Sequence, residues 1–382
     1  KRPEYRAYRA ADADVGPAHF EKAVKRGRKM SIYEREIKRI AEGDLPWEKL
    51  EGKSILISGA TGMIGKCLVD VLMARNVNAT REKKIRVAAL SRNEERAKER
   101  FASYMGTEDF VYRSCDVNRE IPECGQVDYV IHAASNTHPV QYAGDPIGTI
   151  ASNVTGTKNL LDYAVSHGTK HFCFLSSVEI YGENRGDVEK FPEGYLGYLD
   201  CNTLRAGYPE SKRLGETLCN AYQKTYDLDF SIPRLSRIYG PTMLSSDTKA
   251  ISQFIKKAKA GEDIVLKSEG NQKYSYTFVT DAVEAILVVM LCGESGEAYN
   301  IADEASDITL KELAGMLADI AGTKVVFELP EETERQGYST ATKAMLSAEK
   351  LEKLGWHERV HMEEGLSELS RMGYNSGNRN EK

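Results

Sequence analysis

A short apolar run that leads into three spaced glycines constrains the fold of this chain more than any other feature. The run Ser54-Ile55-Leu56-Ile57-Ser58 is typical of a strand buried in a parallel sheet, and residues 67–74 predict an apolar helix. Gly59, Gly62 and Gly65 lie between the two. A strand, a glycine turn and a helix bring backbone N–H groups and a helix N-terminus to the place where a pyrophosphate can bind. The GxxGxxG spacing differs from the GxGxxG of the common dinucleotide fingerprint and indicates a subset of such folds.

The alternation of strands and helices continues beyond this unit. Further apolar runs predict strands at residues 85–90, 111–115, 127–134 and 170–175, and a helix that begins at Asn153. This order predicts an α/β fold, a doubly wound parallel sheet of the Rossmann type. The length of 382 residues predicts either two domains or one large domain with a satellite lobe.

The ends of the predicted strands supply the candidates for binding a dinucleotide. Ser91 and Arg92 follow the second strand, where an acidic residue would hold a ribose 2′-hydroxyl, and a hydroxyl with a guanidinium suits a 2′-phosphate instead. This favours NADP as the cofactor and leaves NAD open. The full set of predicted cofactor contacts is Gly59, Thr61, Gly62, Met63, Ile64, Gly65, Ser91, Arg92, Asp116, Val117, His132, Ala133, Ala134, Asn153, Tyr208 and Lys212.

Two segments predict the chemistry. Tyr208 and Lys212 are four residues apart on a predicted helix, so the phenol and the ammonium share one face. A fixed cation lowers the pKa of a phenol, and the phenolate can take a proton from a sugar hydroxyl as hydride leaves the same carbon. Ser177 and Glu179 follow the strand at 170–175, so they project where the reactive ring of the cofactor is expected. The Ser177 hydroxyl can hydrogen-bond a substrate oxygen, and the Glu179 carboxylate can move a second proton.

Composition excludes several other classes of protein. The formal net charge of -5 argues against general nucleic-acid binding, and the seven cysteines are scattered without CxxC spacing, so we expect no metal site. No apolar run approaches the roughly 20 residues of a membrane span and no signal peptide is recognisable, so we expect a cytoplasmic protein with no membrane partner. Because the sequence begins at Lys1 rather than Met, it leaves room for an upstream part.

Seven motifs occur in the order typical of one known family, which the chain therefore resembles. They are Gly59-x-x-Gly62-x-x-Gly65, Asp116-Val117, His132-Ala133-Ala134, Ser176-Ser177, Tyr181-Gly182, Tyr208-x-x-x-Lys212 and Arg234-Leu235-x-x-Ile238-Tyr239-Gly240-Pro241. The order resembles the extended short-chain dehydrogenase/reductase family, which comprises nucleotide-sugar epimerases, dehydratases and decarboxylases. The resemblance implies that Ser177, Tyr208 and Lys212 form the catalytic set, that a nucleotide-diphospho-sugar is the substrate, and that the chain forms a homodimer through the helices at 153–165 and 211–226.

The resemblance also implies a division of the chain. We expect a basic helical extension or linker at residues 1–50, a dinucleotide-binding Rossmann domain at 51–240 and a tail at 373–382. Residues 241–372 would form mainly a smaller C-terminal α/β lobe that binds substrate, with some return to the Rossmann domain.

Within the family the sequence is most similar to UDP-glucuronate decarboxylases. The segment from Tyr195 to Glu216 resembles their characteristic run, and Glu179 matches the glutamate that decarboxylases and 4,6-dehydratases use. By this likeness Ser135, Arg205, Arg237 and Tyr274 are the predicted substrate contacts.

The chain departs from these decarboxylases at several positions. Tyr274-Ser275-Tyr276 stands where they have Arg-Ser-Phe, Thr242 where they have Arg, and Val178 where they have Ser; Ser91-Arg92 replaces the acidic strand end of the NAD-using enzymes. Arg237 occupies a position where many relatives have Asn, so it can return one of the lost positive charges.

These patterns predict an NAD(P)-dependent enzyme that oxidises a nucleotide-sugar at C4 and then decarboxylates or 4,6-dehydrates the 4-keto intermediate. The alternative reaction is 4-epimerisation. An alternative of another class is a cofactor-binding sensor or an RNA-binding relative without catalysis; such relatives commonly lose the Tyr or the Lys, and this chain keeps Ser177, Tyr208 and Lys212. The nucleotide and the sugar stay open.

Overall fold

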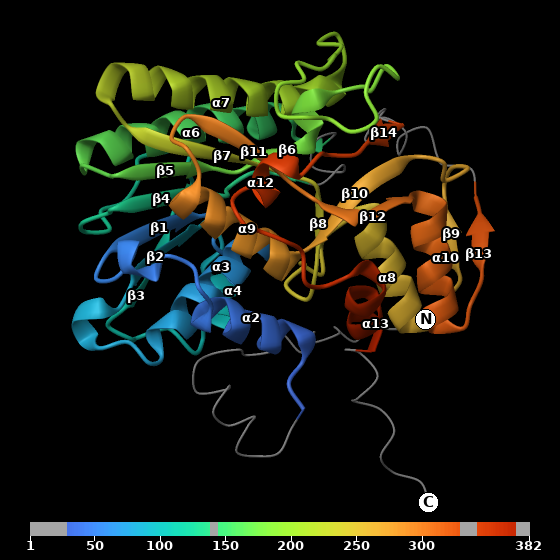
Figure 1. Ribbon diagram of the computed structural model, residues 1–382, viewed down its shortest axis with the longest axis horizontal. Helices are drawn as coiled ribbons and strands as arrows, with labels where there is room; N and C mark the ends of the chain where they lie inside the picture. Colours follow the sequence, from blue (N-terminus) through green and yellow to red (C-terminus); the bar gives the residue numbers. More distant parts are fainter. Residues whose placement is uncertain (1–28, 138–143, 329–341, 372–382) are drawn as a thin grey trace, which may run out of the picture.

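The computed structural model describes residues 29–137, 144–328 and 342–371, and eight strands of these residues form one sheet (Figure 1). The strands run in the order β11-β7-β5-β4-β1-β2-β3, β6 pairs with β7, and every pair is parallel. The predicted doubly wound parallel sheet is therefore confirmed. The strands are β1 (Ser54–Ser58), β2 (Arg86–Ser91), β3 (Phe110–Ser114), β4 (Tyr129–His132), β5 (His171–Phe174), β6 (Ser176–Ser177), β7 (Asp229–Leu235) and β11 (Glu297–Ile301).

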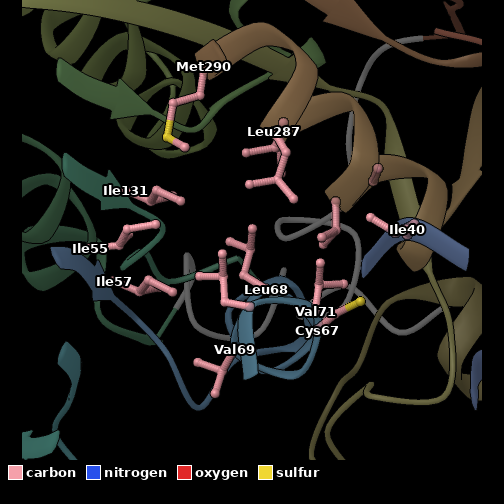
Figure 2. Packing of buried hydrophobic residues seen from close by; sticks show 14 of the residues in the cluster. Ile40, Ile55, Ile57, Cys67, Leu68, Val69, Val71, Ile131, Leu287 and Met290 are labelled. Atoms are coloured by element: carbon pink, nitrogen blue, oxygen red, sulfur yellow. The ribbon is translucent and has the colours of Figure 1, made fainter. Parts of the chain in front are cut away.

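Helices cover both faces of this sheet (Figure 1). Ile55 and Ile57 of β1 pack into the same core as α3 and α9, whereas Leu56 points to the core that contains residues of α6 and α7. Figure 2 shows the first core, where Leu68 of α3 and Leu287 of α9 approach the sheet. Burial on both faces explains why the β1 run is apolar at every inner position. The helices around the sheet are α3 (Met63–Asn76), α4 (Glu94–Arg100), α6 (Pro146–Ser166), α7 (Gly207–Tyr226) and α9 (Val279–Cys292), with short 3₁₀ turns η1 (Trp47–Lys49), η2 (Arg81–Lys83), η3 (Val178–Tyr181) and η4 (Leu204–Ala206).

Helix α6 begins earlier than the sequence pattern predicted. Its first residue is Pro146, about two turns before Asn153. The Asp145 carboxylate caps the helix by accepting a 2.9 Å hydrogen bond from the Gly148 N–H, and proline suits the first turn because its missing N–H is not needed there. The Asp-Pro pair is the sequence signal that would have located this start.

A second sheet lies beside the first and carries the smaller lobe. Strand β10 pairs in parallel with β8 and β14 and antiparallel with β12. The helices α8, α10 and α13 pack against one another beside it, and their apolar faces share one core. The lobe consists of β8 (Arg237–Tyr239), β10 (Lys273–Phe278), β12 (Asp303–Thr309) and β14 (Lys343–Ala344), the parallel pair β9 (Ile264–Leu266) and β13 (Val325–Phe327), and the helices α8 (Ala250–Ala260), α10 (Leu310–Ala321) and α13 (Met362–Arg371). The short helix α12 (Glu349–Glu352) returns to the large sheet, where it packs on β11.

Two of the points at which the chain passes between the two sheets are neighbours. Ser236 alone separates β7 from β8, and Ala302 alone separates β11 from β12. The Ser236 N–H donates a 3.0 Å hydrogen bond to the carbonyl oxygen of Ile301, and the Ser236 and Thr277 hydroxyls are 2.7 Å apart. The two crossings therefore form one hydrogen-bonded seam.

The helix α2 (Ile32–Glu42) packs on the core of the large sheet. It begins with a capping box between Ser31 and Glu34, and Ile37 and Ile40 are buried in the core with α3. The Tyr33 hydroxyl donates a 2.7 Å hydrogen bond to the Asp70 carboxylate, which lies on α3. The boundaries drawn from the sequence stay a prediction; residues 1–28 and the tail 373–382 lie outside the described residues.

None of the helices in the described residues combines the length and the apolar character that a membrane crossing requires.

Candidate active site

A cavity of about 830 Å³ opens where the sheet reverses its strand order and meets the second sheet. Segments that are far apart in the sequence line it, from the glycine turn after β1 to Arg237 on β8. Most of the predicted site residues meet here: Gly59, Thr61, Gly62, Met63, Ile64, Gly65, Ser91, Arg92, Asp116, Val117, Ala133, Ala134, Ser135, Ser177, Glu179, Arg205, Tyr208 and Arg237. The predicted residues that do not line it are His132, Asn153, Lys212 and Tyr274.

The glycine turn fits the pyrophosphate of a dinucleotide. Gly59 has a φ of +68°, and a Cβ atom there would lie 2.7 Å from the backbone of Ala134. A Cβ atom on Gly65 would lie 2.5 Å from the Gly59 carbonyl oxygen, so both positions exclude side chains. No side chain caps α3, whose N-cap is Gly62, and its first N–H groups are therefore directed to the cavity side of the turn.

The end of β2 carries the Ser91 hydroxyl and the Arg92 guanidinium at the place where an acidic residue would hold a ribose 2′-hydroxyl. Ser91 and Arg92 both line the cavity, and the Arg92 guanidinium donates a 3.4 Å hydrogen bond to the Asn136 side-chain oxygen. Asp116 and Val117, which follow β3, line the same cavity. The Ser91 hydroxyl and the Arg92 guanidinium are groups that can donate hydrogen bonds to a bound ribose or its phosphate.

His132 and Asn153 lie beneath the cavity rather than in its lining. The His132 ring nitrogens are 2.7 Å from the Ser58 hydroxyl and 3.0 Å from the Thr157 hydroxyl. Burial lowers the pKa of His132 to about 3, with a smaller contribution from the Lys212 charge, so the ring is neutral.

Asn153 reaches the cavity through a neighbour. Its side-chain oxygen accepts a 2.7 Å hydrogen bond from the Ser135 hydroxyl, and its amide donates a 2.9 Å hydrogen bond to the Ser211 hydroxyl on α7. Asn153 therefore positions Ser135, which does line the cavity. The roles of His132 and Asn153 as cofactor contacts stay predictions.

Tyr208 opens into the cavity from the first turn of α7 and is buried. Burial raises the pKa of its phenol to about 12, and hydrogen bonds with Ser177 and Ser135 oppose that rise. The sequence pattern predicted a lowered pKa. The difference arises because desolvation penalises the phenolate more than the neighbouring polar groups stabilise it.

The Lys212 ammonium lies one helical turn away but points to the sheet. It donates a 2.8 Å hydrogen bond to the Leu175 carbonyl oxygen and lies 4.8 Å from the centre of the Phe174 ring. Burial lowers the pKa of Lys212 to about 8. The shared helical face is present, but the charge is held at the end of β5 in this structure.

Glu179 lies between two arginines. The Arg205 Nη2 atom is 2.7 Å from Glu179 Oε2, and the Arg237 Nη2 atom is 3.7 Å from Glu179 Oε1. The Arg237 guanidinium also lies 3.7 Å from the centre of the Tyr274 ring. The parallel pairing of β8 with β10, which sets Arg237 opposite Tyr276, brings these groups together.

Some cavity residues were not predicted from the sequence. Ser236 directly follows β7, so the rule that places ligands beyond the carboxyl ends of parallel strands would have found it. Asp247 and Lys249 line the cavity from the loop before α8, and no motif marks them. In the described residues no group of three or more His, Cys, Asp or Glu side chains could hold a metal ion.

Comparisons with known proteins agree with this architecture. The model of the NAD dependent epimerase/dehydratase family matches residues 55–302. UDP-glucuronic acid decarboxylase 5 of Arabidopsis thaliana is 31% identical over 315 residues, which cover 82% of this chain and 86% of that protein.

Solved structures with a similar fold include two enzymes of nucleotide sugars. The UDP-glucose 4-epimerase of Thermotoga maritima superposes with a TM-score of 0.72 at 22% identity and covers 85% of this chain and 99% of its own. The dTDP-glucose 4,6-dehydratase of Streptomyces venezuelae, solved with NAD bound, has a TM-score of 0.70 at 24% identity and covers 85% of this chain and 97% of its own.

Proposed function

The chain belongs to the NAD dependent epimerase/dehydratase family, and from this premise we propose that it oxidises a nucleotide-diphospho-hexuronate at C4 and then decarboxylates it. One observation carries the proposal. Ser177, Glu179 and Tyr208 line the same cavity as the glycine turn that precedes α3. A redox cofactor and a sugar can therefore share one enclosed site with a hydroxyl, a carboxylate and a phenol.

The cofactor would bind along the glycine turn and the ends of β2, β3 and β4. Ser91 and Arg92 support NADP over NAD, because a hydroxyl and a guanidinium at the end of β2 suit a 2′-phosphate; Glu94 and Glu95 at the start of α4 line the same cavity. The bound nicotinamide ring would supply the acceptor for the hydride that leaves C4.

The oxidation uses groups of this chain. Tyr208 accepts the proton of the C4 hydroxyl as the carbon loses hydride, and the Ser177 hydroxyl donates a hydrogen bond to the forming carbonyl oxygen. For this role the Tyr208 pKa must fall from about 12, and Lys212 is the cation nearest to it on α7. A shift of Lys212 away from Leu175 towards the phenol would provide that stabilisation.

The second step removes the carboxylate that the ketone has made labile. With a carbonyl at C4, the bond between C5 and the C6 carboxylate can break, because the electrons pass to the C4 oxygen as an enolate. Proton donation to C5 and return of hydride to C4 then complete the reaction. Glu179 is the acidic group of the segment after β5 and is the proposed carrier of the C5 proton.

The same segment favours decarboxylation over 4,6-dehydration. Dehydration needs one group to take the C5 proton and another to protonate the leaving hydroxyl, whereas decarboxylation needs only protonation of C5. Val178 precedes Glu179 and is buried and apolar, so the segment offers one carboxyl group rather than two.

The second candidate reaction is 4-epimerisation. The 2.7 Å contact with Arg205 restrains the Glu179 side chain. If Glu179 does not reach C5, the ketone can only take hydride back on its other face, which inverts C4.

We further propose that two copies of the chain pair through α6 and α7. Ile147 and Ile150 on α6 and Leu214 and Tyr226 on α7 are exposed apolar side chains on these packed helices. A cytoplasmic location stays a prediction from the sequence.

Incubation of the purified protein with UDP-glucuronate, UDP-glucose and dTDP-glucose, followed by mass spectrometry, tests the proposed reaction. We expect a product of UDP-glucuronate that is lighter by the mass of carbon dioxide. A product lighter by the mass of water indicates dehydration, and an isomer of unchanged mass indicates epimerisation.

Two Tyr→Phe variants complete the test. Tyr208→Phe should lower turnover by about 10²- to 10⁴-fold, as expected for loss of an acid–base group. Tyr198→Phe removes an exposed phenol outside the cavity and should leave turnover unchanged. Unaltered turnover in Tyr208→Phe, or no turnover of any sugar nucleotide by the wild type, would contradict the enzymatic role and favour a cofactor-binding sensor.

A further inference from the structure

We propose that Arg237, seated on the Tyr274 ring, selects a carboxylated sugar by exchanging its contact with Glu179 for the carboxylate of the substrate. The inference rests on the proposed function, whose substrate it narrows to nucleotide-sugars that carry a carboxylate. Arg237 would distinguish carboxylated sugars from neutral ones. Ser177, Tyr208 and Lys212 cannot do so, because those groups act at C4.

The first argument is the charge of the cluster. Arg205 and Arg237 bring two positive charges, and Glu179 brings one negative charge. All three side chains are at least three-quarters shielded from solvent, so water screens the charges of the cluster poorly. A sugar carboxylate would add a second negative charge beside the two guanidinium groups, which a neutral hexose would not.

The second argument is that the two arginines hold Glu179 unequally. The 2.7 Å contact with Arg205 is a charge-assisted hydrogen bond. The 3.7 Å contact with Arg237 lies beyond hydrogen-bond length, so it is an ionic contact only. An incoming carboxylate that forms short hydrogen bonds with Arg237 therefore gains more than the loss of the Glu179 contact costs. Glu179 keeps Arg205 as its partner throughout.

The third argument is that the Arg237 guanidinium is held in a fixed plane. Its centre lies 3.7 Å from the centre of the Tyr274 ring, and Tyr274 is 4% exposed. Tyr274 and Tyr276 lie two residues apart on β10, and Tyr276 is the register partner of Arg237 on β8. The ring restricts the orientation of the guanidinium above it, and the N–H edge of a guanidinium matches the two oxygens of a carboxylate.

The fourth argument is the location of the cluster. Glu179, Arg205, Arg237 and Tyr208 line one cavity, and the Glu179 and Arg205 charges both act on the Tyr208 phenol. A sugar whose C4 hydroxyl meets Tyr208 therefore places its C5 substituent near the cluster. The carboxylate of a hexuronate is that substituent.

Calorimetric titration of the protein as purified, with its cofactor, tests the inference without requiring turnover. The ligands are UDP, UDP-glucose and UDP-glucuronate, compared in the wild type and in Arg237→Gln. We expect Arg237→Gln to lower the affinity for UDP-glucuronate by about 10- to 100-fold, the usual effect of losing a hydrogen bond between charged groups. The affinities for UDP and UDP-glucose should stay within about twofold.

Further variants test the Arg237 guanidinium and the supporting Tyr274 ring separately. Arg237→Lys keeps the charge but not the planar edge and should give an intermediate loss for UDP-glucuronate. Tyr274→Phe keeps the ring and should retain the preference for the carboxylated ligand, whereas Tyr274→Leu should lower it. Arg185→Leu is the matched control, since Arg185 stacks on Tyr198 at 4.0 Å and does not line the cavity. This control should bind all three ligands as the wild type does.

Distinct outcomes would overturn the inference. An equal loss of affinity for all three ligands in Arg237→Gln would mean that the guanidinium binds the diphosphate. No loss of affinity for any ligand would mean that it binds neither the diphosphate nor the sugar carboxylate. If Arg237→Gln does not fold, shown by its circular dichroism, the Arg237→Lys and Tyr274 variants give the same comparison. A preference for UDP-glucuronate that depends on Arg237, in a protein that converts no sugar nucleotide, would refute the proposed reaction and leave this inference standing.

Discussion

The Lys212 ammonium donates a 2.8 Å hydrogen bond to the carbonyl oxygen of Leu175. The contact fixes a positive charge at the end of β5, where the side chain is 3% exposed. The Phe174 ring on the same strand provides a further partner. The site thus maintains a desolvated cation one helical turn from Tyr208, and that cation has a cost for the folded protein.

We expect Lys212→Met to stabilise the protein at pH 7 while it lowers turnover. Burial lowers the pKa from 10.5 to about 8, so the folded state binds fewer protons than the unfolded state between these values. The charged lysine therefore costs about 3 kcal/mol below pH 8, at 1.36 kcal/mol per pKa unit, and the cost disappears as the pH rises above 10.5. Loss of the bond to Leu175 offsets about 1 kcal/mol of the gain.

Urea unfolding of Lys212→Met and wild type between pH 7 and pH 11 measures this difference. The advantage of the variant should shrink as the pH rises. Lys224→Met removes an exposed lysine of the same helix and should show no such trend. An advantage that stays constant over this range would show that desolvation of the charge is not its cause.

We expect Glu179→Gln to separate the two chemical steps. The amide keeps the shape of the side chain but cannot carry the C5 proton, so release of carbon dioxide or protonation of C5 should slow by about 10²- to 10⁴-fold. Oxidation at C4 should persist, because Tyr208 and Ser177 are unchanged. The ultraviolet absorbance of the reduced nicotinamide should then build up after addition of UDP-glucuronate. Glu210→Gln on α7 is the control, and equal slowing of both steps would argue against a separate role for Glu179.

We expect Arg92→Ala to weaken NADP and spare NAD. Arg92 lines the cavity beside Ser91, and a bond between a guanidinium and a phosphate is worth about 1.5–3 kcal/mol, or about 10- to 100-fold in affinity. Protein fluorescence titrations with both dinucleotides measure the ratio. Lys98→Ala removes a cation of α4 that pairs with Glu94 and Glu95 and should change neither affinity. Equal weakening of both cofactors would place Arg92 away from the ribose phosphate.

We expect Tyr33→Phe to destabilise the protein by about 1.5–3 kcal/mol, because it removes a buried hydrogen bond to a carboxylate. Asp70 is fully buried and also accepts a 2.7 Å hydrogen bond from the Tyr104 hydroxyl. Denaturant titration measures the loss. Tyr195→Phe removes a hydroxyl that donates to Asp187 at the surface, and it should cost much less stability than Tyr33→Phe. If Tyr33→Phe and Tyr195→Phe had the same free energy of unfolding, α2 would not be anchored through Asp70.

The large sheet could be predicted from the sequence because its signals are local. The apolar run of β1, the glycine turn and the rule for strand ends each depend on residues close in the chain. They predicted that Ser177, Glu179, Tyr208 and the glycines lie at one site. The likeness to the decarboxylases added Arg205.

Other features depend on contacts between distant segments, and no local pattern signals them. The stack of Arg237 on Tyr274 follows from pairing of the three-residue strand β8 with β10. The raised pKa of Tyr208 follows from the depth of its burial, which helical spacing does not report. The core position of α2 also required the structure, since a polar helix with one apolar stripe resembles a surface helix until its partner is known.

The seam at Ser236 and Ala302 has a consequence for motion. Hinge closure between lobes requires a few residues whose backbone torsions can change, and each crossing here is a single residue. The Ser236 N–H is held by the carbonyl oxygen of Ile301, which directly precedes Ala302. We therefore expect the two lobes to move as one rigid body. Ligand entry and product release would then be gated by side chains and loops at the mouth of the cavity, so the rate of exchange would reflect local rearrangement instead of domain opening.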